Sequence, residues 1–224
     1  MGAAAIAVIA FVLVAARTPA DGADTQPVSV HAGAIRTIVL QDVPGQLTIT
    51  GVTGSQVTMT GQLHWAGRPA TLAVQPRPAR HLLRLAYRCA AGSPCTADLR
   101  LTVPPRTAIV LRQPSGHVVL AGLAGSLRIS ARSVEVRATR LRAPVFAATI
   151  TSGQLSAAFV SPPRQVAVTL RSAQATLQLP ASVRYRLRQR VVSGYLHAGI
   201  PQAGKAGRVI SARIDSGELA LLPR

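Results

Sequence analysis

The sequence has few of the groups on which enzymes depend. Its 224 residues include only seven carboxylates, and its five histidines are scattered without a carboxylate at short spacing. Neither a G-x-S-x-G nucleophile motif nor a G-x-x-x-x-G-K phosphate loop occurs. Asp215 and Glu218 form the only close acidic pair after residue 30, whereas β-helical enzymes that cleave polysaccharides use clustered carboxylates or calcium sites. We therefore predict no enzymatic activity, no metal site, no cofactor and no small-molecule substrate.

Cysteine is nearly absent as well. The only two, Cys89 and Cys95, enclose a short segment that contains the turn formers Gly92, Ser93 and Pro94. A catalytic redox pair usually has the spacing C-x-x-C, and two thiols without a nearby histidine do not complete a zinc site. The pattern favours a disulfide across the mouth of a β-hairpin in an exported protein, where closing so small a loop stabilises the fold by about 2–2.5 kcal/mol.

The scarcity of acidic residues leaves the chain strongly basic. Lys and Arg number 25 against 7 Asp and Glu, a formal net charge of +18, and Lys205 is the only lysine. An excess of this size implies attraction to anionic surfaces or polymers. Non-specific binding of nucleic acid is one alternative, but proteins that bind single strands stack the bases on aromatic side chains, and aromatic residues make up only 3% of this chain. We predict no specific nucleic-acid partner.

Charge is missing altogether from the first residues, MGAAAIAVIAFVLVAA, which precede Arg17. This apolar run fits the core of a signal peptide and is shorter than the roughly 20 residues that a membrane-spanning helix needs. Residues 1–17 are therefore interpreted either as a signal peptide or as a membrane anchor whose start lies upstream. Residues 18–30, which contain TPADGADTQP, are predicted to be a linker. Both interpretations predict an exported protein on the extracellular face, membrane-anchored or secreted.

After residue 30, helical periodicity is almost absent and short alternating runs of apolar and polar residues take its place. Such runs, bounded by Gly, Pro and Ser, are typical of an all-β chain. We expect strands in QLTIT (46–50), QVTMT (56–60), LLRLAYR (82–88), ADLRLTV (97–103), HVVL (117–120), SLRIS (126–130), VEVRA (134–138) and QVAVTL (165–170).

A Ser-Gly motif recurs in the second half of the chain. Degenerate copies at Ser133 and Ser172 lack the glycine, so their turns should be less demanding. The six serines are spaced close to 20 residues apart, which predicts a β-solenoid or β-helix-like stack with one supersecondary unit per repeat. Glycine permits a positive φ at a corner, and the serine hydroxyl can satisfy the backbone of the turn. The structural corners are predicted at Ser115 and Gly116, Ser152 and Gly153, Ser193 and Gly194, and Ser216 and Gly217.

These motifs resemble a known family. The segments RCAAGSPC (88–95), TADLRLTVPP (96–105), PSGHVVLAGLAGSLRIS (114–130), TSGQLSA (151–157), LQLPASVRYRL (177–187), VSGY (192–195) and VISARIDSGELALLP (209–223) are similar to the bacterial "putative adhesin" β-strand-repeat domain of actinobacterial type, a family of unknown function. The resemblance covers roughly residues 43–224. It implies an exported, often membrane-anchored, solenoid-like β domain without catalytic residues.

The segment SVRYRLRQRVVSG (182–194) places arginine at every second position. In a strand its odd residues, Val183, Tyr185, Leu187 and Val191, would face the core and its arginines would face outward. One interpretation is that these arginines join others on neighbouring strands to form a face for an anionic ligand. The other is that they only keep a β edge soluble and unpaired. The candidate face consists of Arg184, Arg186, Arg188, Arg190, Arg128 and Arg137.

We thus expect one all-β domain over residues 31–224, with opening strands and a disulfide hairpin in 31–103 and repeat coils in 104–224. The predicted function is that of a non-enzymatic cell-envelope surface module. It would act in adhesion or scaffolding, or bind anionic envelope polymers or lipid headgroups of a membrane surface. Two alternatives stay open: a non-specific nucleic-acid-binding protein and a purely structural exported β domain.

Overall fold

The computed structural model describes residues 24–33 and 35–224, in which strands joined by turns and loops predominate. The helical structure in this range is one turn of 3₁₀ helix, Pro78–Arg80. The signal peptide or anchor predicted for residues 1–17 lies outside the described residues. Within the described range, no helix combines the length and the apolar character that crossing a bilayer requires.

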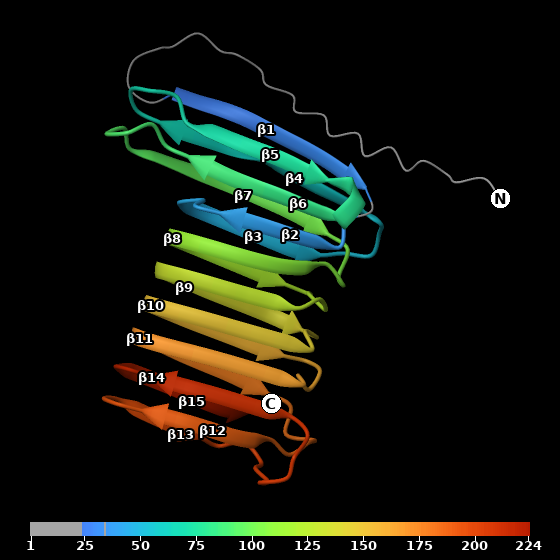
Figure 1. Cartoon of the computed structure of the whole chain (residues 1–224), viewed down its shortest axis with the longest axis vertical. Helices are drawn as coiled ribbons and strands as arrows, with labels where there is room; N and C mark the ends of the chain where they lie inside the picture. The colour runs from blue at the N-terminus through green and yellow to red at the C-terminus, as the bar shows by residue number, and fades with distance from the viewer. Residues whose placement is uncertain (1–23, 34) are drawn as a thin grey trace, which may run out of the picture.

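The centre of the molecule is a set of four long parallel strands in regular register (Figure 1). Ile109 lies opposite Leu127, Leu127 opposite Phe146, and Phe146 opposite Val166. Alternate residues of each strand are buried, as the alternating sequence runs predict. The strands are β8 (Ala108–Ala121), β9 (Leu127–Leu141), β10 (Val145–Phe159) and β11 (Gln165–Leu179).

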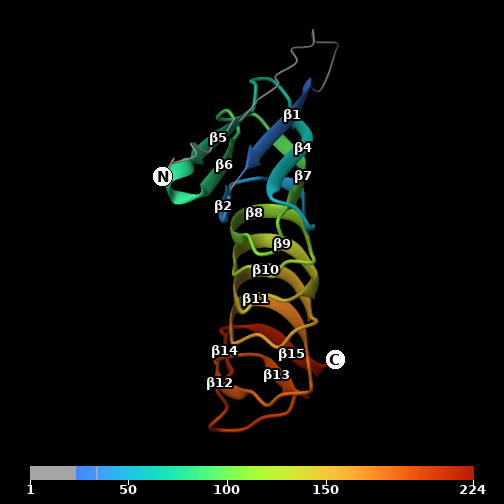
Figure 2. The same ribbon diagram turned by 90° about the vertical axis from the view of Figure 1, so that its right-hand side faces the viewer.

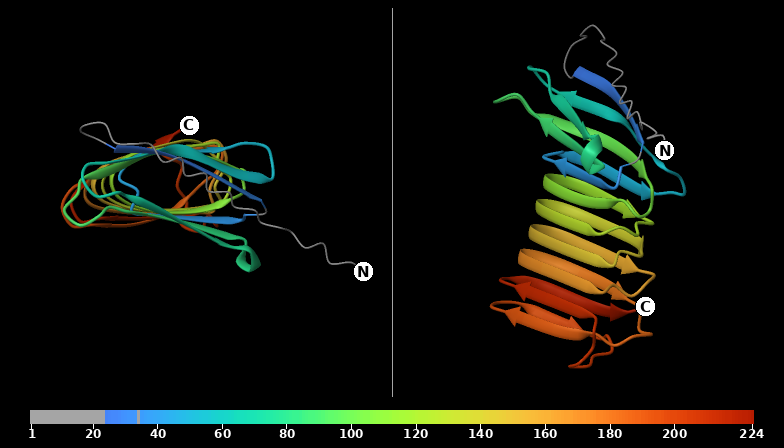
Figure 3. Two further views of the ribbon diagram at one scale, coloured as in Figure 1. Left: turned by 90° about the horizontal axis from the view of Figure 1, so that it is seen from above. Right: turned by 45° about the vertical axis from the view of Figure 1, so that its right-hand side comes forward.

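Each long strand bends near its middle, so that its two halves lie in two opposed layers (Figure 2; Figure 3, left). The bends coincide with the serine positions: Ser133 lies opposite Ser115 and Ser152, and Ser152 lies opposite Ser172. Gly153 has a φ of 109°, and a Cβ there would collide with the carbonyl oxygen of Val134 on the neighbouring strand. The corners without glycine, at Ser133 and Ser172, turn without a positive φ in the residue that follows.

The C-terminal strands do not stack in chain order. β14 and β15 both pair with β11, whereas β12 pairs only with β14 and β13 pairs with β15. β14 and β15, the last strands of the chain, therefore lie between β11 and the earlier strands β12 and β13. β12 and β13 form the end of the stack (Figure 1). These strands are β12 (Arg186–Val191), β13 (Tyr195–Ala198), β14 (Val209–Ile214) and β15 (Gly217–Pro223).

The N-terminal end of the stack shows the same departure from chain order. β2 and β3 pair with β8, and β6 and β7 pair in parallel with the outer edges of β2 and β3. Antiparallel strands then extend the end: β4 pairs with β7, β1 with β4, and β5 with β6. The bounds are β1 (Asp24–Gly33), β2 (Thr37–Gln41), β3 (Gly45–Gly51), β4 (Gln56–Trp65), β5 (Thr71–Arg77), β6 (Leu82–Arg88) and β7 (Cys95–Val103).

Two expectations about this end need correction. β1 begins at Asp24, so residues that we assigned to a linker form a strand; Pro27 is tolerated there because β1 pairs on one side only, with β4. The predicted disulfide between Cys89 and Cys95 is present. It does not close a hairpin, however, because β6 and β7 pair with different strands and not with each other.

The interior between the two layers is apolar, with one buried polar side chain that joins two corners. Phe146 and Phe159 meet edge to face there, with ring centroids 5.4 Å apart. Gln113 is buried, and its amide nitrogen donates to the carbonyl oxygens of Val43 and Ser115. This side chain ties the turn between β2 and β3 to the corner of β8.

Candidate functional site: a cationic basin beside the terminal strand

Three of the four arginines in the 182–194 row, Arg186, Arg188 and Arg190, lie on the terminal strand β12, and Arg184 precedes it. As the alternation predicts, Tyr185 is fully buried, while Arg188 and Arg190 are exposed on the outer side. Arg186 is half-buried, and its Nε has no hydrogen-bond partner. Val191 departs from the prediction because it is 39% exposed. No strand of the described residues lies beyond β12 to cover this position.

The other two arginines of the predicted face do not join this row. Arg128 and Arg137 come from the two halves of β9 and therefore lie on opposite layers. Arg128 shares the layer of Arg188 but stands four strand-to-strand steps away, about 19 Å at about 4.8 Å per step. Ala147 and Ala167 occupy positions between them. The six arginines thus do not form one continuous face.

A denser group of cations lies where the chain turns from one strand to the next, close to the start of β12. Four positive side chains line a hollow of about 670 Å³ on this edge of the molecule, which we call the cationic basin. All four come from segments between strands, and two of them, Arg164 and Arg208, directly precede β11 and β14. Its cations are Arg164, Arg184, Lys205 and Arg208, and small residues of the 203–207 segment complete the lining.

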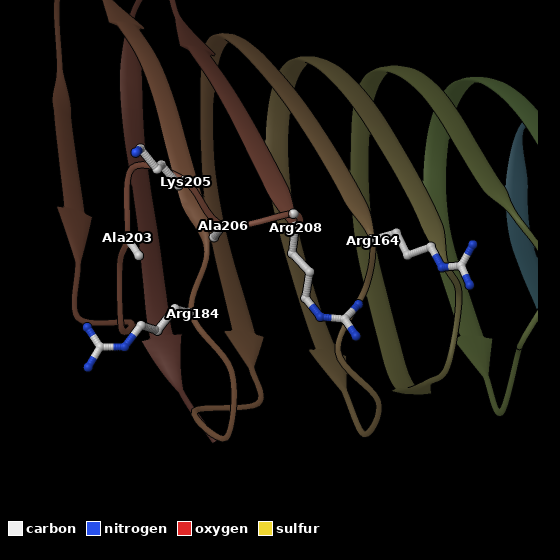
Figure 4. Close-up of a pocket in the computed structure, with 7 residues that line it drawn as sticks. Arg164, Arg184, Ala203, Lys205, Ala206 and Arg208 are labelled. Carbon is white, nitrogen blue, oxygen red and sulfur yellow. The ribbon is translucent and has the colours of Figure 1, made fainter.

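The four cations surround the hollow and do not converge on one point (Figure 4). The side chains of Arg164 and Arg208 extend toward one side of the view, whereas those of Arg184 and Lys205 lie on the other. Such a spacing suits several anionic groups of one extended molecule better than a single small ion.

Arg208 also has a structural role in the basin. It is half-buried, and its guanidinium donates to the carbonyl oxygens of Pro162 (3.1 Å) and Pro163 (3.4 Å). Burial raises the pKa of the neighbouring Tyr185, and the charge of Arg208 opposes that rise. The Tyr185 hydroxyl donates to the carbonyl oxygen of Pro180 (3.2 Å). The backbone carbonyl oxygen of Arg208 accepts a hydrogen bond from the amide of Arg186 (2.8 Å). Arg208 therefore connects the segments that carry the exposed cations Arg164 and Arg184.

No carboxylate of the described residues neutralises the basin. The ion pairs among the described residues lie away from the basin. They join His64 to Asp98 (3.4 Å), His117 to Glu135 (3.4 Å) and Arg213 to Asp215 (3.0 Å). Four positive charges around one hollow repel one another when no counter-charge is present. A bound anion would relieve that repulsion.

The two layers also differ in charge on their outer surfaces. Three of the acidic residues, Asp98, Glu135 and Glu218, occupy laterally aligned outward positions on the layer formed by β7, β3, the second halves of the long strands, β15 and β13. The opposite layer has no outward carboxylate at the described strand positions. Its outward arginines include Arg84, Arg88, Arg112, Arg128, Arg186, Arg188, Arg190 and Arg213.

The sequence pointed to only part of the basin. Arg184 belongs to the predicted row, but Lys205 and Arg208 lie in the segment 199–208, which sequence alternation does not place next to Arg164. The available signal was that this segment carries two cations and no carboxylate. The 199–208 segment lies beside β12 because β14, and not β12, is the strand next to β11. The sequence pattern does not predict this order of strands.

The acidic pair singled out in the sequence does not form a site. The Asp215 carboxylate accepts a hydrogen bond from Arg213 Nε at 3.0 Å, and Glu218 lies on the outer surface between the positions of Gln174 and Tyr195. In the described part of the chain, no three His, Cys, Asp or Glu side chains are grouped closely enough to hold a metal ion.

No protein-family model and no curated protein matches the sequence. The structure, in contrast, resembles solved structures. One is a putative cell adhesion protein from Clostridium sporogenes ATCC 15579, with a TM-score of 0.51 and 12% identity over 88% of this chain and 100% of that one. The others are a putative adhesin from Bacteroides fragilis NCTC 9343 (TM-score 0.37, 12% identity, 91% and 99% covered) and a putative lipid binding protein from Parabacteroides distasonis ATCC 8503 (TM-score 0.32, 9% identity, 89% and 97% covered).

At this level of identity, the comparison with the Clostridium sporogenes structure establishes a shared all-β fold. The fold is therefore that of an elongated protein built from an open β-sheet, as in the Clostridium sporogenes structure.

Proposed function

We propose that this protein is a non-enzymatic surface domain that binds phosphate-bearing polymers of the cell envelope through the cationic basin. The observation that carries the proposal is the group of four cations around one hollow, with no carboxylate of the described residues paired to any of them. We further propose that the residues from Asp24 onward form a single β-solenoid domain of the adhesin type, exported and either membrane-anchored or secreted.

Phosphate is the anion that fits the basin best on chemical grounds. Arginine binds phosphate oxygens through two parallel N–H donors, and lysine adds a mobile point charge. Because the cations lie on different sides of the hollow, an extended phosphodiester chain can satisfy more of them at once than a single phosphate can.

An extracellular location agrees with two features of the molecule. The disulfide between Cys89 and Cys95 is of a kind that persists in oxidising compartments. The Clostridium sporogenes structure with a similar fold is described as a putative cell adhesion protein, which is consistent with a general role in binding at surfaces. Nucleic acid is a weaker candidate because the lining of the basin contains no aromatic side chain for base stacking.

Two sources of phosphate must be distinguished, a polymer and a lipid headgroup. The test measures binding to poly(glycerol phosphate), to vesicles that contain phosphatidylglycerol, and to duplex DNA at the same salt concentration. The variant Arg164→Gln, Arg184→Gln, Lys205→Gln removes three basin charges and leaves Arg208 with its structural contacts. The control Arg100→Gln, Arg128→Gln, Arg137→Gln removes three exposed charges from outside the basin.

The proposal predicts that the basin variant loses most of its binding to the polymer and that the control retains it. Binding to vesicles but not to the polymer would assign the phosphate to a lipid headgroup and overturn the proposal that the ligand is a polymer. Equal losses in both triple variants would show that net charge alone drives binding, and tighter binding to DNA would favour the nucleic-acid alternative.

A further inference from the structure

The outer edge of β12 has a free row of backbone groups. The amides of Arg186 and Val192 donate to Arg208 and Ile214, so the even residues of this strand direct their backbone groups toward β14. The odd residues between them, Leu187, Gln189 and Val191, direct theirs to the opposite side. No strand of the described chain pairs with that side of β12.

The chain itself shows that this edge accepts another segment. Just before β12, the amide of Tyr185 donates to the carbonyl oxygen of Pro201 (3.0 Å), and the amide of Ala203 donates to the carbonyl oxygen of Tyr185 (2.9 Å). Tyr185 and Gln202 thus form an isolated parallel bridge on the outer side. The 199–208 segment then leaves the edge, and the same line of backbone groups continues unpaired along β12.

Apolar exposure is concentrated at the same end of the molecule. Of the five large hydrophobic side chains exposed in the described range, three lie on or beside β12 and β13: Val191 (39%), Val192 (67%) and Tyr195 (79%). Leu187, which points to the core side, is only half-buried. An added strand would complete the cover over Leu187 and Val191.

The charge of β12 selects the kind of strand that can be added. Pairing with β12 of a second copy would set the row Arg186, Arg188 and Arg190 against an identical row, and like charges directly opposite one another are destabilising. A strand with carboxylates at alternate positions would instead place an acidic side chain opposite each arginine.

We propose that the β12 edge binds an extended acidic segment of a partner protein by β-strand addition. In this arrangement the backbone of Leu187, Gln189 and Val191 supplies the hydrogen bonds, and the arginine row selects alternating carboxylates. This site is separate from the phosphate-binding role of the basin, so either can fail without the other.

The test uses a synthetic peptide with alternating Glu and Val, and two control peptides. One control has Lys in place of Glu, and the other keeps the Glu residues but has Pro in place of Val, so that it carries the same charge without forming a strand. Binding is measured by calorimetry, and amide hydrogen exchange of the full chain reports protection at Leu187, Gln189 and Val191. We expect the Glu-Val peptide alone to bind tightly and to protect these three amides.

Two variants test the geometry. Gln189→Pro removes an amide that faces the open edge and is not used in the ladder with β14, so the strand should remain while the affinity for the Glu-Val peptide falls by about tenfold. The double variant Arg188→Glu, Arg190→Glu should bind the Lys peptide more tightly than the Glu-Val peptide. The basin variant should bind the Glu-Val peptide as the wild type does. Equal binding of the Glu-Val and Glu-Pro peptides, absence of amide protection, or unchanged affinity in Gln189→Pro would each overturn the proposal.

Discussion

Arg190 of β12 lies directly opposite Arg213 of β14 on the outer side of the sheet. Arg213 is paired with Asp215 at 3.0 Å, whereas no described carboxylate lies within ion-pair distance of Arg190. Like charges directly opposite each other on neighbouring strands destabilise a sheet. The pair therefore weakens the attachment of the terminal strand and leaves a positive charge available to an anionic partner.

Replacing one member of this pair should stabilise the fold. We expect Arg190→Gln to raise the free energy of unfolding by about 0.2–1 kcal/mol at low ionic strength, with a smaller gain in high salt because salt screens exposed charges. Urea unfolding at two salt concentrations measures the effect. The control Arg128→Gln lies opposite Val110 and Ala147 and should bring no gain. A loss of stability in Arg190→Gln at both salt concentrations would contradict the expected repulsion.

Tyr87 should make the fold sensitive to alkaline pH. Its hydroxyl donates to the carbonyl oxygen of Thr96 (2.8 Å), and burial raises the pKa of Tyr87 from 10.0 to about 12. Because the folded state holds this proton more tightly than the unfolded state, the stabilisation is present below pH 10.0 and is lost as the pH rises toward about 12. Urea midpoints across this window should fall for the wild type and fall less for Tyr87→Phe. Identical slopes for the two proteins would exclude Tyr87 as a source of the pH dependence.

Loss of the disulfide should lower stability by the amount that its small loop allows. We expect Cys89→Ala with Cys95→Ala to reduce the free energy of unfolding by about 2–2.5 kcal/mol. Reducing agent should lower the stability of the wild type by a similar amount and leave the double variant unchanged. A wild type that is insensitive to reductant would show that the loop is held by its other contacts.

The corner of β10 should not tolerate a side chain. In Gly153→Ala the added Cβ points at the carbonyl oxygen of Val134, and the φ of 109° is unfavourable for alanine. We expect a loss of about 1–3 kcal/mol in thermal or urea unfolding. Gly204→Ala is a matched control, because no atom lies within 4 Å of the Cβ position there. Equal stability of the two variants would mean that the corner relaxes without cost.

Most local features of the fold could be predicted from residue patterns. Alternation placed Val166 and Val168 inside and identified many of the strands, although β1 was assigned largely to a linker, and the two cysteines indicated their bond. The predicted hairpin at the disulfide was wrong because two alternating runs with a short loop between them give no information about which strands pair. β6 and β7 instead follow β2 and β3, one in each layer.

The candidate site could be predicted only in part, for a related reason. Leu187 of β12 and Ile210 of β14 both belong to strands with an apolar side, so the pattern does not reveal which of the two strands lies against β11. The structure places β14 there, and this brings Arg208 beside Arg164 and leaves β12 at the edge. A site made from segments between strands depends on this order, which is fixed by long-range packing.

The most direct test of the proposed function is the salt dependence of binding to poly(glycerol phosphate). If the basin contacts phosphates, a plot of log affinity against log salt concentration should have a steep negative slope, because each contact releases counterions. The variant Arg164→Gln, Arg184→Gln, Lys205→Gln should reduce the magnitude of that slope by about 2, and the control Arg100→Gln, Arg128→Gln, Arg137→Gln should leave it nearly unchanged. A slope that is the same in the wild type and the basin variant would contradict binding of the polymer in the cationic basin.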